Sequence, residues 1–272
     1  MRMNVSFPIC ATCGTQFAES VSPPTACPVC EDERQYVGWS GQIWTTHEEL
    51  GVSYKLRLDE EEGLLTMGLE PAFAINQRVL LLPTDAGNIL WECLSLVTPE
   101  AVAAIKAHGG LDYIVISHPH FYASMVEWSE AFGGVPILLH EADKAWVLRS
   151  SPHIRFWSGD EHRLSETVTL ICCGGHFDGS TALHWKHGPR EGGALFPGDA
   201  LQVAMDRRHV TLMYSYPNYI PMRPADVRHI QSRMQGYEFA DLFGFSAKRN
   251  IIGGAREAVN QSFDRYFKAI SE

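Results

Sequence analysis

Two pairs of closely spaced cysteines near the start of the chain limit most strongly how that part of it can fold. Cys10 and Cys13 form the first pair, and Cys27 and Cys30 form the second after 13 intervening residues. Each C-x2-C pair makes a tight turn that directs two thiolates to one point, so two pairs supply four ligands for a tetrahedral zinc ion. A segment of about 30 residues buries little core, so a metal cross-link is expected. Residues 1–36 are therefore predicted to form a zinc-ribbon-like knuckle with a structural Zn²⁺.

The composition of the whole chain excludes several classes of protein. The 272 residues are 45% hydrophobic and carry a formal net charge of −10, which argues against nucleic-acid binding through bulk positive charge. No apolar run reaches the roughly 20 residues of a membrane helix, and the first residues lack the apolar core of a secretory signal. Four of the seven cysteines fall in the two tight pairs, so a disulfide framework fits poorly. The predicted location is the cytoplasm.

After residue 36 the pattern changes to alternating strands and helices. Short runs rich in Val, Ile and Leu predict strands, whereas capped or amphipathic runs predict helices. The predicted strands cover residues 78–82, 88–94, 111–117, 135–140, 168–173, 181–185 and 194–196. The predicted helices cover residues 99–108, 122–132, 141–149, 224–237 and 255–270. Residues 37–272 are therefore expected to form a layered α/β domain.

Three of the predicted strands are each followed by side chains that commonly bind metal ions. His118 and His120 follow the first of these strands, and Pro119 between them stiffens the loop and favours an extended conformation at His118. His176 follows a later strand in a turn that has glycines on both sides, which allows the chain to turn sharply. Asp199 follows a third strand directly after a glycine. Each residue taken alone is equally typical of an ordinary loop.

In this order and spacing, the three segments resemble the motifs of the metallo-β-lactamase fold superfamily. That family has a (T/S)-H-x-H-x-D-H loop, then a G-G-H turn, then a G-D turn. The matching stretches are residues 117–120, 174–180 and 198–199, and the strands over residues 78–94 resemble the early hairpin of the family. The resemblance covers roughly residues 40–272. It implies a four-layer αββα sandwich with a metal site at the open edge of two sheets, to which the small zinc knuckle predicted from the cysteines is attached.

The resemblance also implies which residues bind metal, and the chain departs from the family at some of them. His118, His120 and His176 match the first metal site, and Asp199 matches the usual bridging carboxylate. Tyr122 and the following alanine stand where the family has Asp and His, and the family's last histidine is missing near residues 250–254. A single ion is therefore expected. Three imidazoles fit a catalytic Zn site, while two histidines with Asp199 would fit non-haem Fe.

These residues predict a mononuclear metallohydrolase that acts on a small ester, thioester or lactone through a metal-bound water. An ion lowers the pKa of bound water to about 7. Asp199 would be a fourth ligand or would orient the water, and Tyr122 would polarise a substrate oxygen or hold the nucleophile. Two alternatives stay open. One is an iron-dependent oxidoreductase on the same scaffold, and the other is a non-catalytic protein whose cavity binds a ligand and whose knuckle contacts a partner.

The stretch over residues 213–222 is unusually aromatic, with three tyrosines and two prolines. We expect it either to form a wall beside the cavity or to pack beneath the C-terminal helix. The nine histidines and three cysteines outside the predicted metal sites are expected to have ordinary structural roles.

Overall fold

Two β-sheets packed face to face form the main body in the computed structural model, which describes residues 5–270. The larger sheet has seven strands, in the order β3 (Lys55–Glu61), β4 (Leu64–Glu70), β5 (Val79–Thr84), β6 (Gly87–Trp91), β7 (Tyr113–Val115), β8 (Ile137–His140) and β9 (Ile154–Trp157). The other has six strands, in the order β10 (Glu161–Arg163), β11 (Val168–Cys172), β12 (Thr181–Trp185), β13 (Ala194–Phe196), β18 (Asp241–Phe243) and β19 (Asn250–Ile251).

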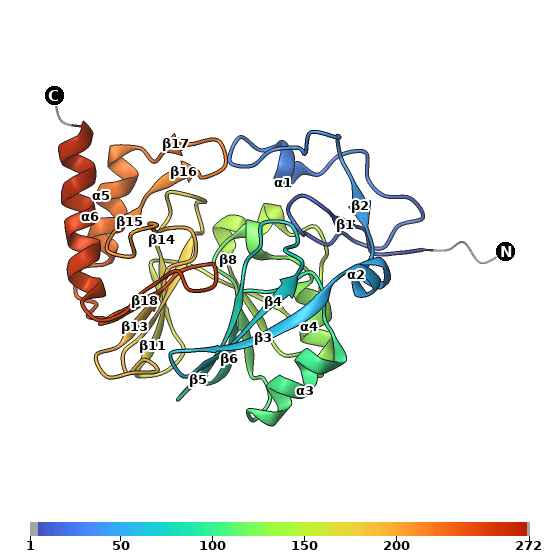
Figure 1. Ribbon diagram of the computed structural model, residues 1–272, viewed down its shortest axis with the longest axis horizontal. Coiled ribbons are helices and arrows are strands. Elements are labelled where there is room, and N and C mark those ends of the chain that lie inside the picture. Colours follow the sequence, from blue (N-terminus) through green and yellow to red (C-terminus); the bar gives the residue numbers. More distant parts are fainter. Residues whose placement is uncertain (1–4, 271–272) are drawn as a thin grey trace.

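Helices cover the outer face of each sheet (Figure 1). Helices α3 (Pro99–Ala107) and α4 (Met125–Ala131) lie on the larger sheet, where Trp128 packs in one hydrophobic cluster with Ile114 of β7. Helices α5 (Pro224–Arg233) and α6 (Ala255–Ile270) lie on the second sheet and belong to a separate cluster. A third cluster lies between the two sheets and joins residues such as Leu82 and Phe196. These three apolar layers confirm the predicted four-layer αββα sandwich.

The predicted elements are largely present, but their bounds change where tertiary contacts decide the local conformation. Strands β5 and β6 pair antiparallel as the predicted hairpin. The prediction of a helix over residues 141–149 is wrong, because the structure has only a short 3₁₀ helix, η2 (Glu141–Trp146). Asp143 within it turns inward and accepts a hydrogen bond from the backbone of Gly179 at 2.9 Å. Helix α4 starts later than predicted, because the 3₁₀ helix η1 (Pro119–Phe121) and a left-handed Ala123 precede it.

The knuckle packs closely against the main body and contributes β1 (Ile9–Cys10) and α1 (Pro28–Glu31). Strand β1 pairs with β2 (Trp44–Thr45), which is followed by α2 (His47–Ser53). The predicted boundary at residue 36 stays a prediction, and the parts of the two predicted domains at residues 1–4 and 271–272 lie outside the described residues. None of the helices in residues 5–270 has the length and apolar character needed to cross a membrane.

Two small hairpins lie between the knuckle and the second sheet (Figure 1). Strands β14 (Gln202–Val203) and β15 (Val210–Thr211) form the first, and β16 (Met213–Ser215) and β17 (Ile220–Pro221) form the second. The β16–β17 hairpin contains the aromatic stretch noted in the sequence. It touches the knuckle on one side and the predicted metal site on the other.

Candidate metal centre

Four predicted ligands come together at one edge of the two sheets. His118 and His120 follow β7, His176 follows β11, and Asp199 follows β13, so three strands of two different sheets end at this point. One potential ligand atom from each of the four side chains lies within 4.8 Å of all the others. The backbone N–H of Thr181 donates to the carbonyl of the residue before His118 at 2.8 Å and joins the two sheets here. We call this group the metal centre.

Hydrogen bonds on the outer side of two imidazoles fix how those rings face the centre. Nδ1 of His176 lies 2.8 Å from the carbonyl oxygen of Tyr214, and a carbonyl only accepts, so Nδ1 carries the proton and Nε2 keeps its lone pair. Nδ1 of His118 lies 2.8 Å from the hydroxyl of Ser117. His118 itself has the extended backbone that was predicted before Pro119. Both rings are therefore oriented by contacts outside the centre.

Burial sets the charge state of the four side chains. The exposed fraction is 1% for His118, 3% for His120, 1% for His176 and 7% for Asp199. Burial lowers the pKa of His118 and of His120 well below the ordinary value, and it lowers the pKa of His176 to about 4. Burial also raises the pKa of Asp199 to about 7. The imidazoles are thus neutral at physiological pH, which is the state that binds metal ions.

The donor atoms fit a metal ion better than they fit one another. Among the described residues, Nε2 of His118 and Oδ1 of Asp199 are buried without a hydrogen-bond partner; Nε2 of His120 is also unpaired, but Nδ1 is the nitrogen of that ring that faces His176. Nε2 of His176 lies 3.2 Å from Nδ1 of His120, close to the about 3.3 Å that separates two nitrogens of a tetrahedral zinc site. Oδ2 of Asp199 lies 3.7 Å from Nε2 of His118. Unpaired buried acceptors are costly unless a cation joins them.

Tyr122 follows His120 by two residues but is packed differently. Its side chain is 2% exposed and belongs to the hydrophobic cluster that covers the larger sheet. Burial raises the pKa of the Tyr122 hydroxyl well above its ordinary value, with the nearby Asp143 and Glu92 adding to the effect. The hydroxyl therefore keeps its proton and can only act here as a neutral hydrogen-bond donor or acceptor. Its predicted role in binding substrate stays a prediction.

Two further groups contact the centre, and only the second was missed in the sequence. The Tyr214 carbonyl belongs to the aromatic stretch, and the Tyr216 ring lies 5.8 Å from the His176 ring, so this stretch does border the centre. Arg34 of the knuckle donates from Nη1 to the carbonyl of His176 at 3.2 Å, and its guanidinium lies 3.8 Å from the centroid of the Phe177 ring. The aromatic composition indicated the first contact. No local pattern indicated the second.

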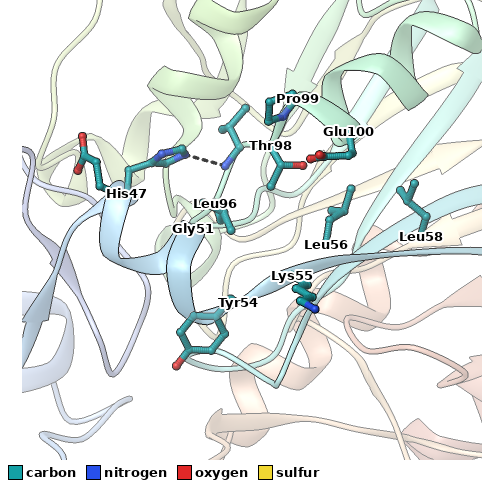
Figure 2. Close-up of a pocket in the computed structure, with 12 residues that line it drawn as sticks. His47, Gly51, Tyr54, Lys55, Leu56, Leu58, Leu96, Thr98, Pro99 and Glu100 are labelled. Atoms are coloured by element: carbon teal, nitrogen blue, oxygen red, sulfur yellow. Dashed lines mark hydrogen bonds between the residues drawn. The ribbon is translucent and has the colours of Figure 1, made fainter.

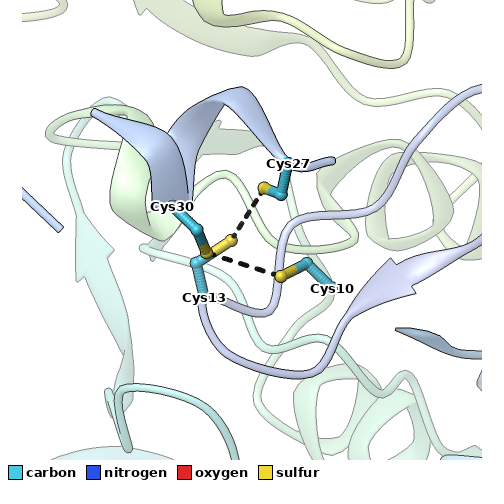
Figure 3. A group of neighbouring side chains, drawn as sticks. All are labelled: Cys10, Cys13, Cys27 and Cys30. Carbon is cyan, nitrogen blue, oxygen red and sulfur yellow. Dashed lines mark hydrogen bonds between the residues drawn. The ribbon is translucent and has the colours of Figure 1, made fainter. Parts of the chain in front are cut away.

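The four cysteines of the knuckle form a second group that could hold a metal ion (Figure 3). All four are buried and unoxidised. Sγ of Cys10 lies 3.5 Å from that of Cys30, and Sγ of Cys13 lies 3.7 Å from that of Cys27, near the about 3.8 Å expected for tetrahedral zinc. Hydrogen bonding with Cys13 lowers the pKa of Cys10, and the same contact raises the pKa of Cys13. Four thiolates this close together would repel one another, so a bound cation is needed to hold them in this arrangement.

A surface pocket of about 690 Å³ lies away from both groups (Figure 2). It opens between α2 and the start of α3, where Nε2 of His47 accepts a hydrogen bond from the backbone of Val97 at 2.9 Å. Tyr54, Leu56 and Leu96 also line it. None of its lining residues belongs to the metal centre, so it gives no route to the predicted chemistry.

Comparison with known proteins identifies a relative and the fold. No family model matches the chain. The uncharacterized protein YmaE of Bacillus subtilis (strain 168) is 42% identical over 266 residues, which are 97% of this chain and 96% of YmaE. The solved DIM-1 metallo-β-lactamase superposes with a TM-score of 0.55 at 12% identity, covering 78% of this chain and 98% of its own.

Two further solved structures agree with this result. A B3 metallo-β-lactamase with an active-site glutamic acid gives a TM-score of 0.52 at 16% identity, covering 75% of this chain and 86% of its own. The Flv1 flavodiiron core from Synechocystis sp. PCC6803 superposes with a TM-score of 0.54 at 10% identity, covering 79% of this chain and 61% of its own. At these identities the likeness shows the fold alone. This chain therefore belongs to the same family as YmaE and has the metallo-β-lactamase fold.

Proposed function

We propose that this protein is a mononuclear metal-dependent hydrolase that acts on a small ester, thioester or lactone. One observation carries the proposal. Three buried, neutral imidazoles and one carboxylate each bring one potential ligand atom to a single point at the sheet edge, where Nε2 of His118 has no hydrogen-bond partner. A bound ion would supply a Lewis acid and would lower the pKa of a water molecule to about 7.

The protein groups divide the remaining work among them. His118, His120 and His176 would hold the ion, with the rings of His118 and His176 kept in place by Ser117 and Tyr214. The Asp199 carboxylate would serve as a fourth ligand or would accept the proton of the nucleophilic water. Without an ion, burial raises the pKa of this carboxyl to about 7; an adjacent cation would lower it and so favour the carboxylate that either role requires.

The surroundings of the centre favour a small, weakly polar substrate. The rings of Phe177, Phe121 and Tyr216 lie within 6 Å of the histidine rings and make the surroundings largely apolar. The neutral Tyr122 hydroxyl would donate a hydrogen bond to the substrate carbonyl. A phosphodiester is a poor fit, because a second ion that would stabilise both attacking and leaving oxygens has no dedicated histidine ligands here.

Hydrolysis by matched variants tests the proposal. The wild-type chain and a His118→Ala/His120→Ala variant would be assayed with a chromogenic ester, a thioester and a lactone, with His108→Ala as the control because that histidine is exposed at the C-cap of α3. We expect the double variant to lose about a hundredfold or more in kcat/KM, since even residues behind metal ligands cost 10–100-fold. The control should keep wild-type activity.

Other results would favour the two alternatives. Iron in the centre together with oxygen-dependent turnover and no hydrolysis would support the oxidoreductase. Ligand binding without turnover in the wild-type protein would support a non-catalytic descendant. Equal hydrolysis by the wild type and the His118→Ala/His120→Ala variant would contradict the proposed mechanism.

A further inference from the structure

The turn that follows the last cysteine of the knuckle lies directly against the metal centre. Residues 32–35 come after α1, whose last cysteine is Cys30. Asp32 holds Arg34 through two hydrogen bonds, from Nε at 2.6 Å and from Nη2 at 2.9 Å. The third nitrogen of the guanidinium, Nη1, donates to the carbonyl of His176, and the planar group covers the Phe177 ring. Arg34 is thus held by the knuckle and in turn holds the backbone of a metal ligand.

The same turn also holds the hairpin that orients the His176 ring. The Tyr214 hydroxyl donates to the Glu33 carboxylate at 2.8 Å, while the Tyr214 carbonyl accepts from Nδ1 of His176. The Ser215 hydroxyl donates to the carbonyl of Arg34 at 3.0 Å. The Asn218 side chain donates to the carbonyls at positions 33 and 35, at 3.0 and 2.9 Å. Both the backbone and the ring of His176 therefore depend on residues 32–35.

The loop after the first cysteine pair reaches the other histidine loop. The backbone N–H of Gln16 donates at 3.1 Å to the carbonyl of Ala123, three residues after His120. The carbonyl of Gly14 accepts from the Ser95 hydroxyl at 2.7 Å. The Ser124 hydroxyl in turn donates to the carbonyl of Ser95 at 2.8 Å. Each stretch that directly follows a C-x2-C pair thus supports one of the two loops that carry histidine ligands.

We propose that the knuckle positions the ligands of the metal centre, so that the two metal sites are coupled, and that Arg34 is the positioning residue for His176. This inference rests on the proposed function, because it requires an ion in the centre. A segment with so little core keeps its turns in place only while its cysteines hold an ion. The contacts made by residues 14–16 and 32–35 then hold the two histidine loops near the geometry that the ion needs. Coupling of this kind acts equally in both directions.

A pair of matched arginine substitutions tests the coupling. Arg34→Met removes the guanidinium but keeps most of the stem. Arg57→Met is the control, because Arg57 pairs with Asp59 two residues away, from Nε at 2.9 Å, on the edge strand β3. The full chain with zinc in its four-cysteine cluster would be titrated with Zn²⁺ against a chromophoric chelator. The readouts are the Kd of the metal centre, the zinc content of the cluster and the melting temperature.

We expect Arg34→Met to weaken Zn²⁺ binding at the metal centre about 10–100-fold, while the zinc content of the cluster stays at one ion. Arg57→Met should bind like the wild type. A merely structural role for Arg34 would lower the melting temperature without changing the Kd of the centre. Arg34→Lys keeps the charge but not the planar fork, so it should also weaken binding, and it provides the same test if Arg34→Met does not fold.

The possible failures are distinguishable. If the wild type binds Zn²⁺ at the centre and both Arg34 variants bind it equally well, the coupling is wrong and the proposed function stands. If the wild type binds no ion there, the proposed function is wrong and the coupling falls with it.

Discussion

Replacing Gly198 with alanine gives a test of the metal centre for which the structure supplies the magnitude. Gly198 precedes Asp199 and has a left-handed backbone with a φ of +53°. A Cβ atom at this position would lie 2.3 Å from the Ser117 hydroxyl and 2.4 Å from the Ser117 Cβ. The Ser117 hydroxyl also contacts the His118 ring. Gly198→Ala must therefore push apart two segments that each carry a ligand of the centre.

The expected cost has two parts that a control can separate. Left-handed backbone costs a residue with a Cβ about 1–2 kcal/mol, and forcing an extra methyl group into a packed site costs about 1–3 kcal/mol. Gly198→Ala should thus lower the free energy of unfolding by about 2–5 kcal/mol. Gly253→Ala is the control, because Gly253 has a φ of +71° and nothing lies within 4 Å of its added Cβ. Gly253→Ala should therefore lose only the about 1–2 kcal/mol that the left-handed backbone costs.

Urea denaturation of the metal-free proteins would measure both values, and zinc titration of the refolded proteins would measure the centre. We expect Gly198→Ala to be less stable than Gly253→Ala and to bind zinc more weakly at the centre. Equal stability of the two variants, with wild-type zinc binding in both, would refute the packing of Gly198 against Ser117.

Three further variants test other parts of the structure. Cys27→Ser should lower both the zinc content and the melting temperature relative to Cys172→Ser, which lies outside the cluster; equal values for the two would refute the structural zinc site. Burial raises the pKa of Asp143 to about 7, so the folded state keeps a proton that the unfolded chain releases, and stability falls as the pH rises from about 4 to 7. In urea denaturations at a series of pH values, Asp143→Asn should reduce this loss of unfolding free energy with rising pH, and a pH dependence equal to that of the wild type would contradict the role of Asp143. Arg78→Met should cost about 3–5 kcal/mol in the same assay, because it leaves the carboxylate of Glu61 without its buried partner; a loss below about 1 kcal/mol would contradict this.

The parts of the metal centre that sequence could predict are those set by short spacing along the chain. The cysteine pairs and the His118–His120 loop each place two ligands within a few residues, so local geometry alone brings them close. The support behind those ligands comes from far along the chain. The carbonyl that orients His176 lies 38 residues away, and Arg34 lies 142 residues away. Such contacts depend on the complete tertiary structure and leave no local pattern.

The fold shows the same division between local and distant causes. Strands β5 and β6 are buried and rich in branched residues, so their pattern was clear. Strand β3 went unassigned because it is an edge strand whose residues are mostly charged and exposed, with only Leu56 and Leu58 on an apolar face. Residues 141–149 have a helical composition, but inward burial of Asp143 replaces the α-helix with a 3₁₀ turn.

Counting metal ions by native mass spectrometry tests the central claim most directly. The claim is that the chain holds one ion among its four cysteines and one at the metal centre. Protein purified without added metal should carry two ions per chain, and the His118→Ala/His120→Ala variant should carry one. A single ion in the wild type that persists in the double histidine variant would contradict the claim, because the metal centre would then be empty in the protein as it is made.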